Sequence, residues 1–241
     1  MNWKYSVYHS LWSMLDLLFP AECGGCGKAG SCWCMDCQKR VTILDGILCE
    51  ICGLPQDKPG VCGTCLAERP RFRALRAWAV FSDPVQHALH GLKYRRNISM
   101  GDTFALHMVP FVKSLNWQID MVIPIPLGRK RYKERGYNQV AMIAKPLALA
   151  LDTRYAPKGL MRRKETRSQV GLTKVERKAN IQNAFQAGRG IAGKSVLIMD
   201  DVSTTGSTLS AGAEVLYSAG ATDVYALTVA RALPQDGLEH A

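Results

Sequence analysis

The residues of this chain best suited to chemistry lie in one continuous stretch, residues 196–208. Four apolar residues, 196–199, predict a buried strand, and the carboxylates of Asp200 and Asp201 end it. A run of small hydroxyl residues around one glycine follows, and a helical pattern then continues to a stop signal at Gly220. A helix N-terminus presents free N–H groups and the positive end of its dipole, so this turn predicts a binding site for an anion.

Carboxylates beside an anion site are compatible when the ligand is a sugar phosphate, because they can accept hydrogen bonds from vicinal ribose hydroxyls. The layout resembles the phosphoribosyl diphosphate (PRPP) signature of type I phosphoribosyltransferases: an apolar strand, two acids, one apolar residue, then Thr-Thr-Gly-x-Thr/Ser. The predicted PRPP-binding residues are Asp200, Asp201, Ser203, Thr204, Thr205, Gly206, Ser207 and Thr208. The two acids are also the catalytic candidates. The alternative is a strand–helix turn with an N-capping hydroxyl, which does not explain the adjacent acids.

Residues 20–66 contain all nine cysteines, which form four C-x-x-C pairs and one extra thiol, Cys32. The predicted metal ligands are Cys23, Cys26, Cys34, Cys37, Cys49, Cys52, Cys62 and Cys65. Two pairs close a tetrahedral four-cysteine site, so the spacing predicts one or two structural zinc ions. The pairing order stays open, as does the replacement of Cys34 by Cys32. Disulfides, a redox-active pair and an iron–sulfur cluster are the alternatives, and disulfides are disfavoured without an export signal.

The chain has 241 residues and a formal net charge of +11. Segments 129–135 and 158–178 carry nearly all of the positive excess. Concentrated positive charge predicts a polyanionic ligand, such as a diphosphate or a nucleic-acid backbone, and the alternative is a solvated basic surface.

No apolar run is long enough to span a membrane, and the N-terminus does not have the pattern of a signal peptide, so we expect a cytoplasmic location. Residues 3–19 predict an amphipathic helix. This helix either packs on its own domain or contacts a partner protein or a membrane surface.

From about residue 72 the pattern alternates between strands and helices. It predicts strands at residues 77–81, 120–126, 195–200 and 223–230, and helices at residues 84–93, 100–115 and 140–151. This order predicts an α/β fold, in which a parallel sheet is flanked by helices and binds ligands at the carboxyl ends of its strands. The predicted domains are residues 1–70, an N-terminal helix with a double zinc-ribbon or knuckle module, and residues 71–241, the α/β domain.

Two loops are expected to meet at the ligand-binding edge of this sheet. One is the hydroxyl loop, residues 203–208, which follows the acidic pair. The other is a basic loop at residues 127–139. The candidates for binding a diphosphate in or near this basic loop are Lys93, Arg129, Arg135, Asn138, Gln139 and Arg163. Residues 153–190 are predicted to form a basic flap that excludes water from the site.

The whole chain resembles the ComF family of bacterial proteins. The resemblance rests on the order of five features: the cysteine pairs after Leu18-Phe19-Pro20, the Leu92-Lys93-Tyr94 motif, the Ile-Pro-Ile-Pro segment before Arg135-Gly-Tyr-Asn-Gln139, the Arg163–Gln169 region, and the PRPP-like stretch. It implies a zinc-binding N-terminal region and a type I phosphoribosyltransferase-like fold. It also implies a link to natural transformation, in which incoming single-stranded DNA is handled at the cytoplasmic face.

Two hypotheses for the function follow. In the first, the chain is a phosphoribosyltransferase that displaces diphosphate at C1 of the ribose, with Mg²⁺ bridging diphosphate and ribose oxygens. In the second, a non-catalytic module uses the same fold to sense PRPP or to bind single-stranded DNA, with Tyr132 and Tyr137 available to stack on bases. The expected partners are PRPP, single-stranded DNA and the proteins of DNA uptake.

Overall fold

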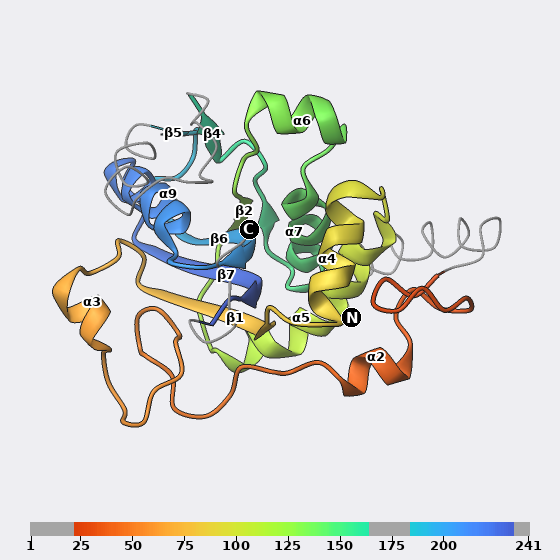
Figure 1. Cartoon of the computed structure of the whole chain (residues 1–241). Helices are drawn as coiled ribbons and strands as arrows, with labels where there is room; N and C mark the ends of the chain where they lie inside the picture. The colour runs from red at the N-terminus through yellow and green to blue at the C-terminus, as the bar shows by residue number, and fades with distance from the viewer. Residues whose placement is uncertain (1–21, 164–183, 234–241) are drawn as a thin grey trace.

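The computed structural model describes residues 22–163 and 184–233, so the predicted helix at residues 3–19 and the middle of the predicted flap lie outside the described residues. Its centre is a five-stranded parallel sheet with the order β1-β7-β6-β2-β3 (Figure 1). These strands are β1 (Ala74–Val80), β2 (Met121–Pro124), β3 (Arg154–Tyr155), β6 (Ser195–Ser203) and β7 (Asp223–Arg231). A separate antiparallel pair joins β4 (Leu160–Arg162) to β5 (Phe185–Ala187).

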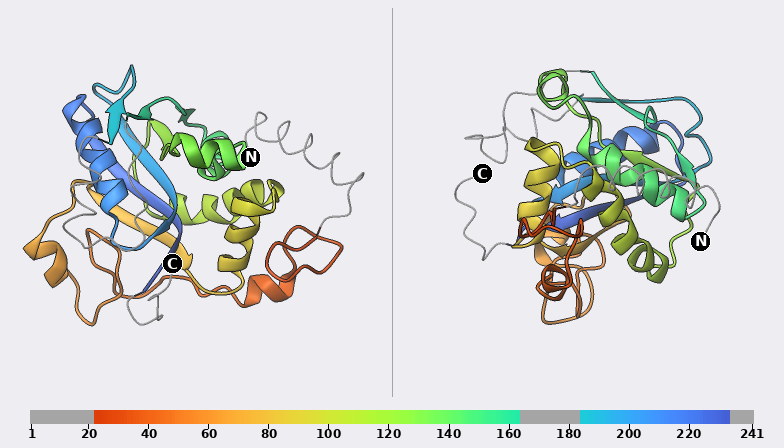
Figure 2. Two further views of the ribbon diagram at one scale, coloured as in Figure 1. Left: turned by 45° about the horizontal axis from the view of Figure 1, so that its top comes forward. Right: turned by 90° about the vertical axis from the view of Figure 1, so that its right-hand side faces the viewer.

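Helices cover both faces of the central sheet, as the two further views in Figure 2 also show. The helices α4 (Val85–Tyr94), α5 (Ser99–Ser114) and α7 (Gln139–Ala150) lie on one face, and α9 (Ser207–Ser218) lies on the other. Each face has its own apolar core, with Leu197 and Leu227 contributing to the first and Ile198 and Ala226 to the second. Because both faces are buried, β6 and β7 consist largely of apolar residues. The predicted α/β fold class is confirmed.

The cysteine-rich segment packs beside this sheet and has little regular structure of its own. Its helices α2 (Met35–Lys39) and α3 (Gly63–Ala67) are each five residues long. The first half contacts α5, where the Trp33 ring lies 6.2 Å from that of Phe104. The second half belongs to the core on the α9 face, to which it contributes Ile51 and Cys65. Only the second half therefore shares a core with α9.

Several elements differ from the sequence-based expectations. The strand β1 begins at Ala74 rather than at residue 77, and the predicted flap at residues 153–190 begins with β3, which belongs to the central sheet. The prediction of a loop at residues 127–139 was wrong for its centre, which forms α6 (Arg129–Arg135). No glycine or proline interrupts these seven residues, and Gly136, with φ 80°, ends the helix by donating its N–H to the carbonyl of Tyr132. The strand β6 also continues beyond its predicted end to Ser203, so both acids lie within the strand. Among the helices of the described ranges, none combines the length and apolar character needed to cross a membrane.

Candidate functional site

The acidic pair and the hydroxyl loop lie at the carboxyl edge of the sheet. The strand β6 carries both acids, and the residues after it lead directly into α9. Its neighbour β2 ends beside the residue that precedes the acidic pair, because Pro124, the last residue of β2, pairs with Met199. The hydroxyl loop and the basic segment 127–139 therefore follow adjacent strands at one edge, where parallel α/β sheets bind their ligands.

Asp201 is held by contacts from two helices. Its Oδ2 forms a 2.7 Å ion pair with Nζ of Lys93, near the end of α4. The same oxygen accepts a hydrogen bond from Nε2 of Gln139, the first residue of α7, at 3.2 Å. Burial acts to raise the pKa of Asp201, but the Lys93 ammonium and these hydrogen bonds hold it below its ordinary value. Asp201 is therefore ionised at neutral pH.

Asp200 has the opposite electrostatic character. Its Oδ1 accepts a hydrogen bond from the backbone N–H of Asp201 at 2.9 Å. Desolvation, reinforced by the adjacent Asp201 charge, raises the pKa of Asp200 well above its ordinary value. When the pKa values of two neighbouring carboxyl groups move apart, one group can hold a proton while the other carries a negative charge. This pattern is common at functional sites.

The hydroxyl loop presents exposed oxygens around a buried glycine. Thr204, Thr205 and Ser207 are exposed, and the hydroxyls of the last two lie 2.7 Å apart. Gly206 stands at the start of α9 with φ 77°, a left-handed conformation that favours glycine, and it has no side chain to cap the helix. The N–H groups of the first turn of α9 face the loop, where that of Ser207 donates to Oγ1 of Thr205 at 3.3 Å, and such N–H groups can bind an anion. Ser203 differs, because it is buried and its Oγ has no hydrogen-bond partner within the described part of the chain.

The structure divides the predicted diphosphate residues into two groups. Lys93 and Gln139 contact the acidic pair, as given above. Arg135 lies nearby on α6, with its guanidinium 4.9 Å from the ring centre of Tyr94 and 3.3 Å from the hydroxyl of that residue. Since Tyr94 directly follows Lys93, this contact links the basic helix to the acid-binding end of α4.

Three other candidates have different surroundings. The side chain of Asn138 accepts the N–H of Val140 and donates to the carbonyl of Ile125 at 2.9 Å, so it caps α7 and ties this helix to the end of β2. Arg129 is exposed at the start of α6. Arg163 follows β4 and donates Nε to the side chain of Gln186 at 2.8 Å. Arg163 thus contacts the β4–β5 pair rather than the acidic residues.

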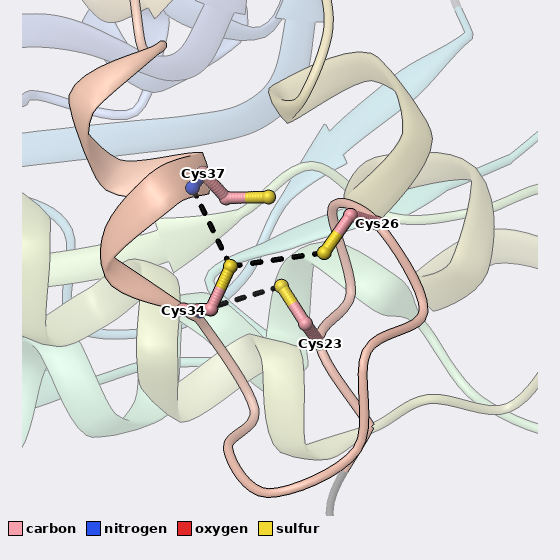
Figure 3. A group of neighbouring side chains, drawn as sticks. All are labelled: Cys23, Cys26, Cys34 and Cys37. Atoms are coloured by element: carbon pink, nitrogen blue, oxygen red, sulfur yellow. Dashed lines mark hydrogen bonds between the residues drawn. The ribbon is translucent and has the colours of Figure 1, made fainter.

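The eight predicted cysteine ligands form two clusters of four thiols. Cys23, Cys26, Cys34 and Cys37 make up the first cluster (Figure 3), and Cys49, Cys52, Cys62 and Cys65 make up the second. Within each cluster all sulfur atoms lie within 4.8 Å of one another. The C-x-x-C pairs therefore combine in sequence order, and Cys34 rather than Cys32 completes the first cluster.

The sulfur separations match zinc. In a tetrahedral site with Zn–S bonds of about 2.3 Å, the sulfurs are about 3.8 Å apart. The Sγ atoms of Cys26 and Cys34 are 3.7 Å apart, and so are those of Cys52 and Cys62. Zinc bound here would connect segments that have almost no strands or long helices of their own, and thus stabilise the local fold.

The first thiol of each cluster in sequence, that of Cys23 or Cys49, has a lowered pKa that favours metal binding. Sγ of Cys23 accepts the backbone N–H of Cys34, and Sγ of Cys49 accepts that of Cys62, both at 3.3 Å. Burial opposes ionisation, but the backbone N–H groups lower the pKa of both leading thiols to about 6. Each cluster therefore offers a thiolate at neutral pH before zinc binds.

We expect Cys32→Ser to retain two zinc ions per chain, because Cys32 stands outside both clusters. Metal analysis of the purified protein checks this expectation, with Cys34→Ser as the matched control that should lose one zinc ion. A zinc content below two in Cys32→Ser would contradict the assignment of the ligands.

Comparison with known proteins agrees with this geometry. Residues 14–66 match the double zinc ribbon domain, and residues 139–239 match the phosphoribosyl transferase domain. The DNA utilization protein YhgH of Shigella flexneri is 31% identical over 200 residues, which cover 80% of this chain and 88% of that protein. Competence protein ComFC of Bacillus subtilis is another relative, 28% identical over 228 residues that cover 91% of this chain and 89% of its own. The chain belongs to the ComF family.

ComF-family membership accounts for both parts of the structure, the two structural zinc sites and the α/β sheet. Among solved structures, a hypoxanthine phosphoribosyltransferase of Staphylococcus aureus aligns with a TM-score of 0.36 and 16% identity, over 57% of this chain and 69% of that one. Sequence reasoning missed that Lys93 and Gln139 contact Asp201, since they were expected to bind the diphosphate. Nothing in the sequence pattern pairs them with an acid so far along the chain.

Proposed function

We propose that this ComF-family chain is a phosphoribosyltransferase-like protein that binds PRPP with Mg²⁺ and serves competence and DNA use on the cytoplasmic side. The observation that carries the proposal is the acidic pair followed at once by the hydroxyl loop and the N-terminus of α9, with Lys93 on the second acid. The names of the relatives, DNA utilization protein and competence protein, support the cellular role.

In this proposal each part of the site binds one part of PRPP. The hydroxyl loop and the first turn of α9 bind the 5′-phosphate, and the two carboxyl groups bind the 2′ and 3′ hydroxyls of the ribose. The Lys93 ammonium has three N–H donors, so it can keep its bond to Asp201 and also donate to a diphosphate oxygen. Bound Mg²⁺ supplies positive charge to the diphosphate.

Turnover, if an acceptor is present, displaces diphosphate at C1 of the ribose. The transition state has oxocarbenium character, so the protein contributes mainly by positioning and by stabilising charge. The ionised Asp201 is suited to the second task because Lys93 keeps it charged.

Titration calorimetry with PRPP and MgCl2 tests the proposal on the zinc-loaded chain. We expect a Kd within the range of about 1 μM to 1 mM that is common for enzyme substrates. The double variant Asp200→Asn with Asp201→Asn should lose detectable binding. Asp223→Asn is the matched control, because Asp223 begins β7 at the opposite edge of the sheet and pairs with Arg73. The absence of binding to the folded wild-type protein would overturn the proposal.

A second function, the binding of single-stranded DNA, is favoured by an aromatic and basic surface on α4 and α6. Tyr94 and Tyr132 are exposed, and the ring of Tyr94 has Arg135 on it and His90 at 4.6 Å. Exposed rings beside a basic helix suit base stacking with backbone contacts. Tyr137, which was also expected to stack, is half-buried and donates its hydroxyl to the carbonyl of Leu92.

We expect Tyr94→Ala to weaken binding of a short single-stranded oligonucleotide by about fivefold or more, since one stacked base contributes about 1–3 kcal/mol. Fluorescence anisotropy at several salt concentrations measures this, and affinity should fall as salt rises. Tyr217→Ala is the control, because this tyrosine lies on α9 and its hydroxyl accepts the N–H of Val224. Equal affinity of the Tyr94 variant and the wild type would exclude this surface.

A further inference from the structure

The second thiol cluster is pressed against the strand β1. The N–H of Leu75 donates to the carbonyl of Ile51, between the two thiols of the third C-x-x-C pair, at 2.7 Å. Gly53 follows this pair with φ 68°, and a Cβ atom placed there would lie 2.5 Å from the carbonyl oxygen of Leu75. No side chain fits between the two segments, so the turn that carries Cys49 and Cys52 cannot move independently of β1.

Two arginines from the sheet hold the backbone of the same turn. Arg231, at the end of β7, is the largest fully buried side chain among residues 22–163 and 184–233, and it donates Nη1 to the carbonyl of Cys52 at 2.6 Å. Arg76, on β1, donates Nη1 to the carbonyl of Cys49 at 3.3 Å and to that of Glu50 at 3.2 Å. A zinc ion with four thiolates carries two net negative charges, and two guanidinium groups balance them. The metal centre and the sheet are therefore connected by charge as well as by packing.

The same elements reach the hydroxyl loop. Arg231 pairs with Ser203 in the β6–β7 register, and the next residue, Ala232, donates its N–H to the carbonyl of Ser203 at 3.0 Å. Ser203 is the last residue of β6 and the first of the hydroxyl run at residues 203–208. The side chain of Arg231 thus contacts the turn that carries Cys49 and Cys52. Its backbone lies beside Ser203, where the hydroxyl loop begins.

A second connection runs through the residues that lead into β1. The ring of Phe72, which is 2% exposed, and Cδ2 of Leu75 both lie 3.4 Å from the position of a Cβ atom on Gly206. The N–H of Arg71 donates to Oγ of Ser210 on α9 at 2.9 Å. Residues 71–75 therefore lie between the second thiol cluster and the glycine that starts the anion-binding helix.

The first thiol cluster has different neighbours. It contacts α5, through Trp33 on Phe104 and through Gly24, whose Cβ position lies 2.4 Å from Sδ of Met100, and it contacts the start of α4, where the Cβ position of Gly25 lies 2.7 Å from Cβ of Pro84. One chain thus contains two four-thiol sites of the same chemistry, and the contacts described above connect the second to the hydroxyl loop.

We propose that metal binding at the second thiol cluster and anion binding at the hydroxyl loop are thermodynamically coupled, with residues 71–75 and Arg231 as the connection. Metal in the second cluster fixes the turn at Cys49–Gly53, which in turn fixes β1 and keeps Gly206 and the start of α9 in the anion-binding conformation. Because coupling is reciprocal, the anion slows the loss of this metal. The identity of the anion as PRPP rests on the proposed function. The connection between the two sites through residues 71–75 and Arg231 does not.

Hydrogen exchange on the full-length, zinc-loaded chain tests the connection without any ligand. Phe72→Leu shortens the side chain that contacts Gly206 and leaves all eight thiols in place. We expect backbone amides of residues 203–210 to exchange severalfold faster, within the range of about 5–150-fold typical of coupling between sites, while both zinc ions are retained. Trp33→Leu makes a comparable change beside the first cluster and should leave these amides unaffected. Unchanged exchange at residues 203–210 in zinc-loaded Phe72→Leu would overturn the proposal.

Zinc release from the wild-type chain to a chromogenic chelator gives a second, independent test. With Mg²⁺ and PRPP present, we expect one of the two zinc ions to leave severalfold more slowly and the other to leave at its original rate. Equal effects on both ions, or no effect on either when calorimetry shows bound PRPP, would overturn the coupling. If calorimetry shows no bound PRPP, the proposed function fails, and the exchange experiment still decides the coupling.

Discussion

Cys52→Ser is expected to destabilise the whole protein, whereas Cys26→Ser should disturb only the first thiol cluster. Cys52 is buried in the same core as Ile198 and Leu209, and its carbonyl accepts the buried Arg231. Structural zinc contributes about 10–16 kcal/mol in zinc-finger peptides, which is comparable with the total stability of a domain, about 5–15 kcal/mol. We expect a loss of about 5 kcal/mol or more, which lowers Tm by about 10–20 °C in a chain of this size.

Cys26→Ser is the matched control for this prediction. Cys26 is the exposed thiol of the first cluster, which contacts α5 and the start of α4. This variant should also lose one zinc ion, but its Tm should fall by less than about 5 °C, as for loss of about 1–2 kcal/mol. Differential scanning calorimetry with metal analysis measures both quantities. Equal shifts of Tm in the two variants would show that the second cluster contributes no more to the stability of the protein than the first.

Asp200→Asn is expected to stabilise the protein while it removes function. Desolvation, together with the charge of Asp201, raises the pKa of Asp200, so keeping this carboxyl group in the folded protein costs free energy. Asparagine can accept the same N–H of Asp201 without that cost. We expect a gain of about 1 kcal/mol, or about 2–4 °C in Tm. PRPP binding should weaken about tenfold or more, because a buried polar group of the ligand left without its partner costs about 1–3 kcal/mol.

The stability gain should depend on pH in a defined direction. A carboxyl group with a raised folded-state pKa contributes stability that is fully present below its unfolded pKa, about 3.9, and is lost as pH rises toward the folded value. The wild type loses this contribution to stability as pH rises. The asparagine variant does not, because it has no titrating group at position 200. The difference in Tm between them should therefore be close to zero below about pH 4 and grow at higher pH. A constant difference at all pH values would contradict the raised pKa of Asp200.

Asp201→Asn is the contrasting variant. The pKa of Asp201 is lowered although burial opposes this, since the Lys93 ammonium and hydrogen bonds favour its charged form. Its contribution to stability is present above the unfolded pKa and is lost as pH falls through the lowered folded value. Asparagine leaves Lys93 without its carboxylate, so we expect a loss of about 1–3 kcal/mol near neutral pH.

Local signals allowed the central strand, the turn and the helix around the acidic pair to be predicted. The apolar run before Asp200 and the glycine at 206 depend only on neighbouring residues, and so do the four C-x-x-C pairs. The helix α6 was missed because its charged residues show no apolar face at helical spacing, while its end depends on the left-handed Gly136.

Long-range contacts could not be predicted in the same way. The ion pair between Lys93 and Asp201 depends on how α4 crosses the sheet, and the grouping of thiols depends on turns at Gly27 and Gly53, which have positive φ. A single sequence carries no pattern that reports such packing. The chemistry of the site residues was therefore predictable, but their partners were not.

The strand order has a consequence for synthesis of the protein on the ribosome. The strand β1, at residues 74–80, pairs in the sheet with β7, at residues 223–231. At translation rates of about 5–20 residues per second, the cysteine clusters and β1 emerge several seconds before the partner of β1 exists. A nascent chain thus exposes an unpaired apolar strand beside newly formed metal sites. Early zinc binding would limit the freedom of this segment, and a premature stop before residue 223 would leave β1 as an aggregation-prone edge.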